Sequence, residues 1–206
     1  MRILGLAGLA VLMLLGLLAM PVVLHIRKSL QRIDMLANGR YIVPAAYGAN
    51  YPLTSDGQRF GRAHGAPRPV PLPRDEATTA EYFTKLVVEG HFPVERKVFS
   101  GPGLRPDTGP ITYAQPLRSE ENAWRIVAGL DAETTPNSTP FLLSRNLVQK
   151  TLGDPPKLAD VPPFGLEGAV VWTFNGGGSF IRAGDLEEVW AELVPEDLRH
   201  LPILPP

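Results

Sequence analysis

Few side chains of this sequence have the types and spacing that catalysis, metal binding or phosphate binding requires. The glycine-rich run from Asn175 to Ser179 is similar to a phosphate-binding loop, but no Lys follows it and the next residues favour a strand. A helix N-terminus, which would supply the anion-binding N–H groups, is therefore missing. We interpret the run as the turn of a hairpin.

The polar residues that commonly hold metals are also poorly spaced. The histidines are His25, His64, His91 and His200, and no two of them have ligand spacing such as i, i+4. Asp131, Glu133 and Asn137 offer oxygen ligands to calcium, but no bidentate Glu follows at the distance that a calcium loop requires. Asn137 also begins a glycosylation sequon, which matters only in a glycosylating secretory pathway. We predict no metal site.

Acidic and hydroxyl side chains do not assemble a catalytic pattern either. Ser144 and Ser179 have no identifiable base, and no G-x-S-x-G motif occurs. Three acidic pairs lie in loops or near expected helix starts, where capping and solvation account for them. They are Asp75/Glu76, Glu120/Glu121 and Glu187/Glu188. The sequence therefore predicts no catalytic residue, no bound cofactor and no enzymatic activity.

Composition narrows the class of protein further. The formal net charge of −1 leaves no electrostatic footprint for nucleic acid. Cys is absent, which excludes disulfides, thiolate metal sites and cysteine nucleophiles, and leaves the redox compartment open. The 22 prolines among 206 residues are about twice the usual share of roughly 5%. These numbers indicate a folded domain with stiff, irregular connections.

The most informative segment is apolar and lies at the N-terminus. Residues 3–24 carry no charge, and as a helix they reach about 33 Å, enough to cross a hydrocarbon core of about 30 Å. The segment ends in Leu18-Ala19-Met20-Pro21, which lacks the small-x-small pattern of a signal-peptidase site. We therefore expect a permanent anchor that contacts membrane lipid through residues 3–24, in preference to a cleaved signal peptide.

The helix is expected to continue beyond the anchor. A row of apolar residues at i, i+4, i+7 and i+11 consists of Ile26, Leu30, Ile33 and Ala37. This amphipathic pattern predicts that residues 25–37 pack against a globular domain. Asn38-Gly39 is the expected C-terminal stop, and Pro21 is expected to bend the helix. We predict a stem over residues 1–38 and one domain over residues 39–206.

Charge leaves the orientation of the anchor open. Arg2 precedes the apolar segment, and Arg27, Lys28 and Arg32 follow it. The positive-inside rule on its own favours a cytoplasmic C-terminal part. The alternative is that these cations decorate the polar side of a docked helix, in which case they carry no information about orientation.

The rest of the chain predicts an α+β domain. Residues 40–76 are expected to be irregular, with polyproline II structure where proline alternates in 67–73. A helix begins at the capping box of Thr78 and Glu81, and Asp185 caps a last helix. The expected strands are 97–99, 141–143, and the hairpin 169–174 with 179–182. Residues 120–130 are expected to form a strand in preference to the alternative, a short helix. Together they predict a small antiparallel sheet packed on the long first helix, with short extra helices and long Pro/Gly-rich loops.

This order of parts resembles the pilin-like proteins of type II secretion and type IV pilus systems, particularly the divergent pseudopilins of Verrucomicrobia. The matching pieces are the stem 3–37 with Pro21 and the segments 78–103, 121–130 and 168–183. The D-G-S turn common in that hairpin is reduced here to Gly177-Gly178-Ser179. The resemblance implies a pilin-like fold and a non-enzymatic structural role. It also implies an inner-membrane anchor, a periplasmic domain, and other pilin-like or secretion-system subunits as partners.

The sequence departs from the pilin pattern in its stem. Pilins carry a basic leader, a cleavage glycine, and a Glu about 17 residues before the stem proline; the corresponding position here is Leu4. The resemblance therefore implies a non-polymerising relative, or a true start upstream of Met1. The alternative function is a membrane-tethered binding module unrelated to secretion, which holds a partner through the Tyr- and Pro-rich residues 41–73.

Overall fold

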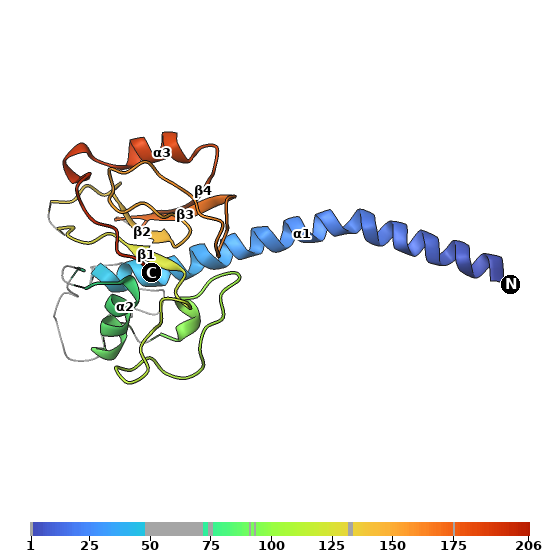
Figure 1. Ribbon diagram of the computed structural model, residues 1–206, viewed down its shortest axis with the longest axis horizontal. Coiled ribbons are helices and arrows are strands. Elements are labelled where there is room, and N and C mark those ends of the chain that lie inside the picture. The colour runs from blue at the N-terminus through green and yellow to red at the C-terminus, as the bar shows by residue number, and fades with distance from the viewer. Residues whose placement is uncertain are drawn as a thin grey trace, which may run out of the picture. The chain divides into compact units, whose positions relative to one another are not determined.

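The computed structural model has an α+β fold with an N-terminal helix and a four-stranded antiparallel sheet (Figure 1). It describes residues 2–47, 72–73, 76–90, 92, 94–131, 134–174 and 176–206, and the side chains of the first helix over residues 19–46. The chain divides into two compact units, Met1–Asp34 and Met35–Pro206. The elements in chain order are α1 (Arg2–Tyr47), α2 (Thr79–Val88), η1 (Arg96–Val98), β1 (Trp124–Ile126), β2 (Pro140–Ser144), β3 (Gly168–Thr173), β4 (Gly178–Arg182), α3 (Leu186–Leu193) and η2 (Glu196–Leu198).

The sheet is a meander in which neighbours in sequence are neighbours in space. Its order is β1-β2-β3-β4, and every pair is antiparallel. Figure 1 shows the strands stacked between α2, beside β1, and α3, beside β4. The predicted late hairpin is confirmed, with Val171 opposite Ser179 and Gly176 at φ 85° in the turn. Glycine accepts that backbone conformation at no steric cost.

The outer edge of β1 is covered by the last residues of the chain. Val127 and Ile203 form an antiparallel bridge. The Leu204 N–H donates to the Ile126 carbonyl at 2.9 Å, and the Ala128 N–H donates to the Pro202 carbonyl at 3.0 Å. Because these bonds satisfy backbone groups that an edge strand would leave open, residues 201–204 protect this side of the sheet.

The core is built from both helices and strands. Its largest fully buried side chains include Trp124, Tyr82, Phe83, Phe99, Phe141, Met35 and Ile42. Phe83 stacks on Phe99 with ring centroids 4.7 Å apart, which joins α2 to the turn after η1. Burial of this much aromatic and aliphatic surface is the main stabilising contribution in a domain of this size.

The first helix is longer than predicted. The expected stop at Asn38-Gly39 is wrong, because α1 continues to Tyr47, and neither Pro21 nor Gly39 interrupts it. The reason is tertiary packing: Ile42, Val43 and Ala46 are fully buried, so their burial outweighs the weak helix propensity of glycine. The predicted irregular region therefore begins too early, since residues 40–47 are helical. Residues 48–71 and 74–75, which carry most of the predicted polyproline segment, lie outside the described residues.

The predicted packing of the apolar row is also wrong. Ile26, Leu30 and Ile33 are 53%, 55% and 59% exposed, whereas Met35 and Ile42 are fully buried. The residues that join the core belong to a second row with the same spacing, nine positions later along the helix. That row consists of Met35, Gly39, Ile42 and Ala46.

Among the residues that the structure describes, no helix combines the length and the apolar character that a membrane span requires. Of the predicted span over residues 3–24, only the side chains from Ala19 onward belong to that part of the chain.

The shorter elements agree with the sequence more closely. Half of the predicted capping box of α2 is confirmed, since the Glu81 N–H donates to Thr78 Oγ1 at 3.1 Å. The reciprocal half is wrong, because the Glu81 carboxylate accepts from the Ala77 N–H and not from the Thr78 N–H. Asp185 occupies the N-cap of α3, but its side chain makes no capping hydrogen bond. The predicted strand at 97–99 is wrong, because Arg96–Val98 is a 3-10 turn.

Candidate functional site

The residues that the sequence offered as candidates for anion binding or nucleophilic catalysis form part of strands and turns, where the structure describes them. The glycine run is a turn: the Thr173 N–H donates to the Gly177 carbonyl at 2.8 Å, and Ser179 is exposed on β4. Ser144 is fully buried, and its hydroxyl accepts from the Val170 N–H at 3.0 Å. Asn175 lies outside the described residues.

The potential metal ligands that the structure describes do not form a cluster. His25 and His200 are exposed in different units, and His64, His91 and Glu133 lie outside the described residues. The carboxylate of Asp131 accepts from the Thr134 N–H at 3.1 Å and so closes a local turn. Within the part of the chain that the structure describes, no group of three or more His, Cys, Asp or Glu is arranged to hold a metal ion.

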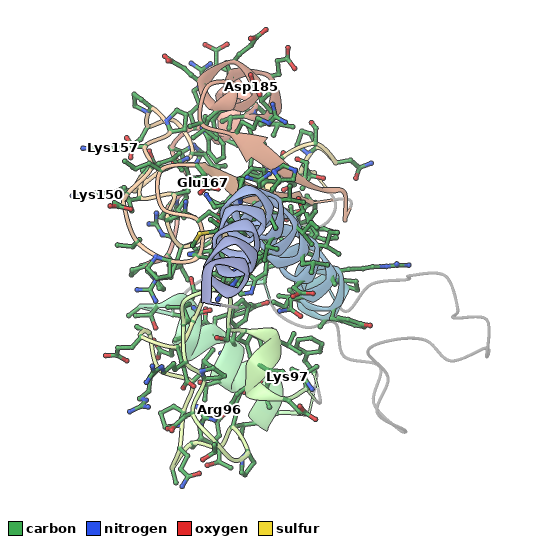
Figure 2. All side chains as sticks on the ribbon, turned by 90° about the vertical axis from the view of Figure 1, so that its right-hand side faces the viewer. Arg96, Lys97, Lys150, Lys157, Glu167 and Asp185 are labelled. Carbon is green, nitrogen blue, oxygen red and sulfur yellow. The ribbon has the colours of Figure 1, made fainter. Side chains whose placement is uncertain are left out.

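One acidic residue has a different role from the predicted one. Glu121 is not solvated: it is 2% exposed and forms an ion pair with Arg96, which is 4% exposed. Its carboxylate also accepts from the N–H groups of Asp107 at 2.7 Å and Arg118 at 2.9 Å. Figure 2 labels Arg96 next to Lys97 in η1.

The ion pair organises the long loop between η1 and β1. The Arg96 guanidinium donates to the carbonyls of Pro110, Gln115 and Pro116, and Glu121 holds the loop from its other end. A buried pair of this kind is stable only when further hydrogen bonds satisfy its charges. Here they satisfy the Glu121 carboxylate and both terminal nitrogens of Arg96, and Nε of Arg96 is left without a partner among the described residues. No local sequence signal indicates it, because the partners are 25 residues apart.

A groove of about 770 Å³ lies between α2 and this loop. Its lining combines Ala80, Leu117 and the exposed Tyr113 with polar residues. The polar groups serve the fold: Lys85 donates to Glu76 at 3.1 Å, and Thr84 Oγ1 accepts from the Leu117 N–H at 3.0 Å. The hydrogen bond to Glu76 raises the pKa of Lys85. Glu76, Thr84 and Lys85 are thus engaged in hydrogen bonds within the fold.

A second buried cation also serves the fold. Arg125 in β1 is 6% exposed, and burial lowers its pKa to about 10. Its guanidinium donates to the carbonyls of Leu147, Ile203 at 3.2 Å and Leu204 at 3.3 Å. These bonds hold residues 203–204 against β1, so Arg125 is an architectural residue and not a ligand-binding one.

Another candidate site is an exposed apolar row on the surface of α1. An α-helix turns by about 100° per residue, so a shift of nine positions rotates a row by about 180°. The exposed row of Ile26, Leu30, Ile33 and Ala37 therefore lies on the helix side opposite to the buried row that starts at Met35. A surface helix normally has one apolar side, and a second one marks an interaction surface. We define these four residues as the exposed row.

The apolar character extends further toward the N-terminus. Met20, Val22, Val23 and Leu24 are between 46% and 61% exposed. The exposed row is therefore the continuation of a longer apolar surface on the same helix. The helical periodicity of the sequence identified the exposed row as apolar, but the prediction that this row packs against the globular domain was wrong.

Comparison with known proteins finds no family model, no curated protein and no solved structure that matches this chain.

Proposed function

We propose that this chain is a membrane-anchored structural or assembly protein of the pilin-like, pseudopilin type. Residues 3–24 anchor it in a bacterial inner membrane, and the α+β domain lies in the periplasm. The exposed row packs against a helix of another pilin-like or secretion-system subunit. The protein acts through these contacts and not through catalysis.

The observation that carries this proposal is the pair of apolar rows on opposite sides of α1. The buried row supplies the helix that the sheet requires for its own core. The exposed row contributes nothing to that core, since its three large residues are more than half exposed. Leaving each such side chain in water forgoes roughly 1.5–3 kcal/mol of burial, which a partner helix would recover. A long helix that serves its own domain on one side and a neighbour on the other is suited to a structural subunit.

The resemblance of the sequence to pilin-like proteins supports the same function. A long first helix, an antiparallel meander and short accessory helices are compatible with that architecture. Residues 3–24 contain no Glu, unlike the stem of ordinary pilins, so we assign the chain to an accessory or non-polymerising role in such an assembly.

The test uses the absence of native Cys. Leu30→Cys places a single thiol in the exposed row, and a maleimide-linked photocrosslinker on it reports the neighbours of α1 in native membranes. Lys28→Cys is the matched control: it is also exposed, and it lies two positions away, about 200° around the helix. Mass spectrometry identifies the crosslinked proteins.

We expect the probe at Leu30 to yield crosslinks to pilin-like or secretion-system subunits, and the probe at Lys28 to yield far fewer. Lipid adducts alone at Leu30, together with purification of a lone monomer from solubilised membranes, would refute the proposal. Capture of an unrelated periplasmic protein would favour the tethered binding module instead.

Orientation needs a separate measurement. Lys157→Cys introduces an exposed thiol in the α+β domain. A membrane-impermeant maleimide added to spheroplasts should label it, as expected for a periplasmic domain. Labelling only after lysis would refute the periplasmic location.

A further inference from the structure

A cationic surface flanks the exposed row of α1 just beyond the apolar segment. Arg27 and Lys28 are exposed and Arg32 is partly exposed, whereas Asp34 is the only carboxylate between residues 19 and 34. At about 100° per residue, Lys28 lies about 170° around the helix from the centre of the exposed row, and Arg27 lies about 90° from it. Positive charge therefore covers the side of this segment opposite to the exposed row and one of its flanks.

The axial position of these cations matches one layer of a membrane. Counted from Leu24, the last residue of the uncharged segment, a helix rises about 4.5 Å to Arg27, 6 Å to Lys28 and 12 Å to Arg32. The headgroup layer on each side of a bilayer is about 5–7 Å thick, which is half the difference between a total thickness of about 40–45 Å and a hydrocarbon core of about 30 Å. Arg27 and Lys28 therefore fall within the headgroup layer, whereas Arg32 lies beyond it.

We propose that Arg27 and Lys28 bind the phosphate groups of anionic phospholipids that surround the stem. This inference rests on the proposed anchor over residues 3–24. The occupant is a lipid surface because charge and depth both fit it: guanidinium and ammonium groups pair with phosphate oxygens, and the apolar side that a protein helix would prefer faces elsewhere. The stem thus contacts a partner helix on one side and anionic headgroups on the other.

The experiment measures the lipid preference of the full chain in a bilayer. The protein is reconstituted into phosphatidylcholine, and electron paramagnetic resonance of chain-labelled phosphatidylglycerol or phosphatidylcholine gives the fraction of lipid immobilised on the protein. We expect phosphatidylglycerol to be preferred several-fold, by up to about fivefold for each interacting cation. The preference should weaken with added salt.

The variant Arg27→Gln/Lys28→Gln should reduce this preference toward unity. The matched control is Lys150→Gln/Lys157→Gln, which removes the same charge from two exposed lysines of the α+β domain (Figure 2) and should retain the preference. Equal loss in both variants would overturn the proposal, because it would report only net charge. Suppression by millimolar inorganic phosphate at constant ionic strength would also overturn it in favour of a soluble anion.

Failure of this inference is distinguishable from failure of the anchor. Immobilised lipid without any preference for phosphatidylglycerol would refute headgroup binding and leave the anchor intact. Absence of an immobilised component with either lipid would refute the anchor, and headgroup binding with it.

Discussion

Gly39 of α1 packs directly against the indole ring of Trp172 in β3. A Cβ on Gly39 would overlap the indole, and Gly178 of β4 approaches the same ring so closely that a Cβ there would overlap it too. Trp172 is 6% exposed and therefore depends on both glycines for its position. This contact explains why a glycine occurs inside a helix, where it costs about 1 kcal/mol relative to alanine.

The contact predicts that Gly39→Ala destabilises the domain by about 2 kcal/mol, although alanine is the better helix former. Overpacking outweighs the gain in propensity, because the indole and the helix backbone must separate. Chemical denaturation of the detergent-solubilised full chain measures the change in free energy of unfolding. Gly184→Ala is the control, since no atom lies within 4 Å of its Cβ position. Trp172→Phe should partly rescue Gly39→Ala, and strictly additive effects would contradict the contact.

Disruption of the buried ion pair between Arg96 and Glu121 is expected to lower the free energy of unfolding much more than disruption of an exposed pair. Arg96→Met leaves the Glu121 carboxylate buried without its counter-ion and should cost about 3–5 kcal/mol. The double variant Arg96→Met/Glu121→Gln should be less damaging than the two single variants added together. The control is the ion pair of Arg118 and Asp107, which are 3.0 Å apart. Their side chains are 59% and 52% exposed, so loss of this pair should cost under about 1 kcal/mol. Similar losses at both pairs would contradict this assignment.

Arg125 predicts a local effect on the last residues of the chain. Arg125→Lys keeps the charge but cannot reach three carbonyls with one planar group, so residues 203–204 should loosen. Hydrogen exchange of the Leu204 amide, which donates to the Ile126 carbonyl, should accelerate at least tenfold. The Val171 amide in the central strand β3 is the internal reference and should change less. Equal acceleration at both amides would indicate global destabilisation instead.

The two rows of α1 predict opposite sensitivities. Ile42→Ala in the buried row should destabilise the domain by about 2–5 kcal/mol, because it leaves a cavity in the core. Ile33→Ala in the exposed row should change the free energy of unfolding of the isolated protein by less than about 0.5 kcal/mol. Thermal and chemical unfolding in detergent compare the two. A large loss from Ile33→Ala would mean that the row packs within its own chain.

The hydrogen bonds of Asp154 predict that the stability of the fold depends on pH in the acid range. Hydrogen bonds from the backbone N–H groups of Thr151 and Lys150 hold the pKa of Asp154 below its ordinary value of 3.8. Its ionised form therefore stabilises the fold above pH 3.8, and this contribution is lost as the pH falls through the lowered pKa. Asp154→Asn should be less stable than the native chain at pH 6, and the difference should disappear in acid. A difference independent of pH would contradict the role of the charge.

Local patterns were sufficient for the elements that depend on neighbours in sequence. Thr78 and Glu81 identified the start of α2, and the β-branched and aromatic run with its glycine turn identified β3 and β4. The exposed row was recognised as apolar at helical spacing for the same reason. These features arise from capping, turn geometry and side-chain periodicity, which act over a few residues.

The sequence by itself determined the α+β class, the hairpin and the unusual apolar character of the N-terminal segment. Only the tertiary structure decided where α1 ends, which of its rows is buried, and how Arg96 and Arg125 are used. Gly39 was predicted to end the helix, but in the structure it packs against Trp172 within α1. Glu121 was predicted to be solvated, but it forms a buried ion pair with Arg96. Each of these outcomes depends on contacts between residues far apart in sequence, whose burial energies exceed the local propensities that a sequence displays.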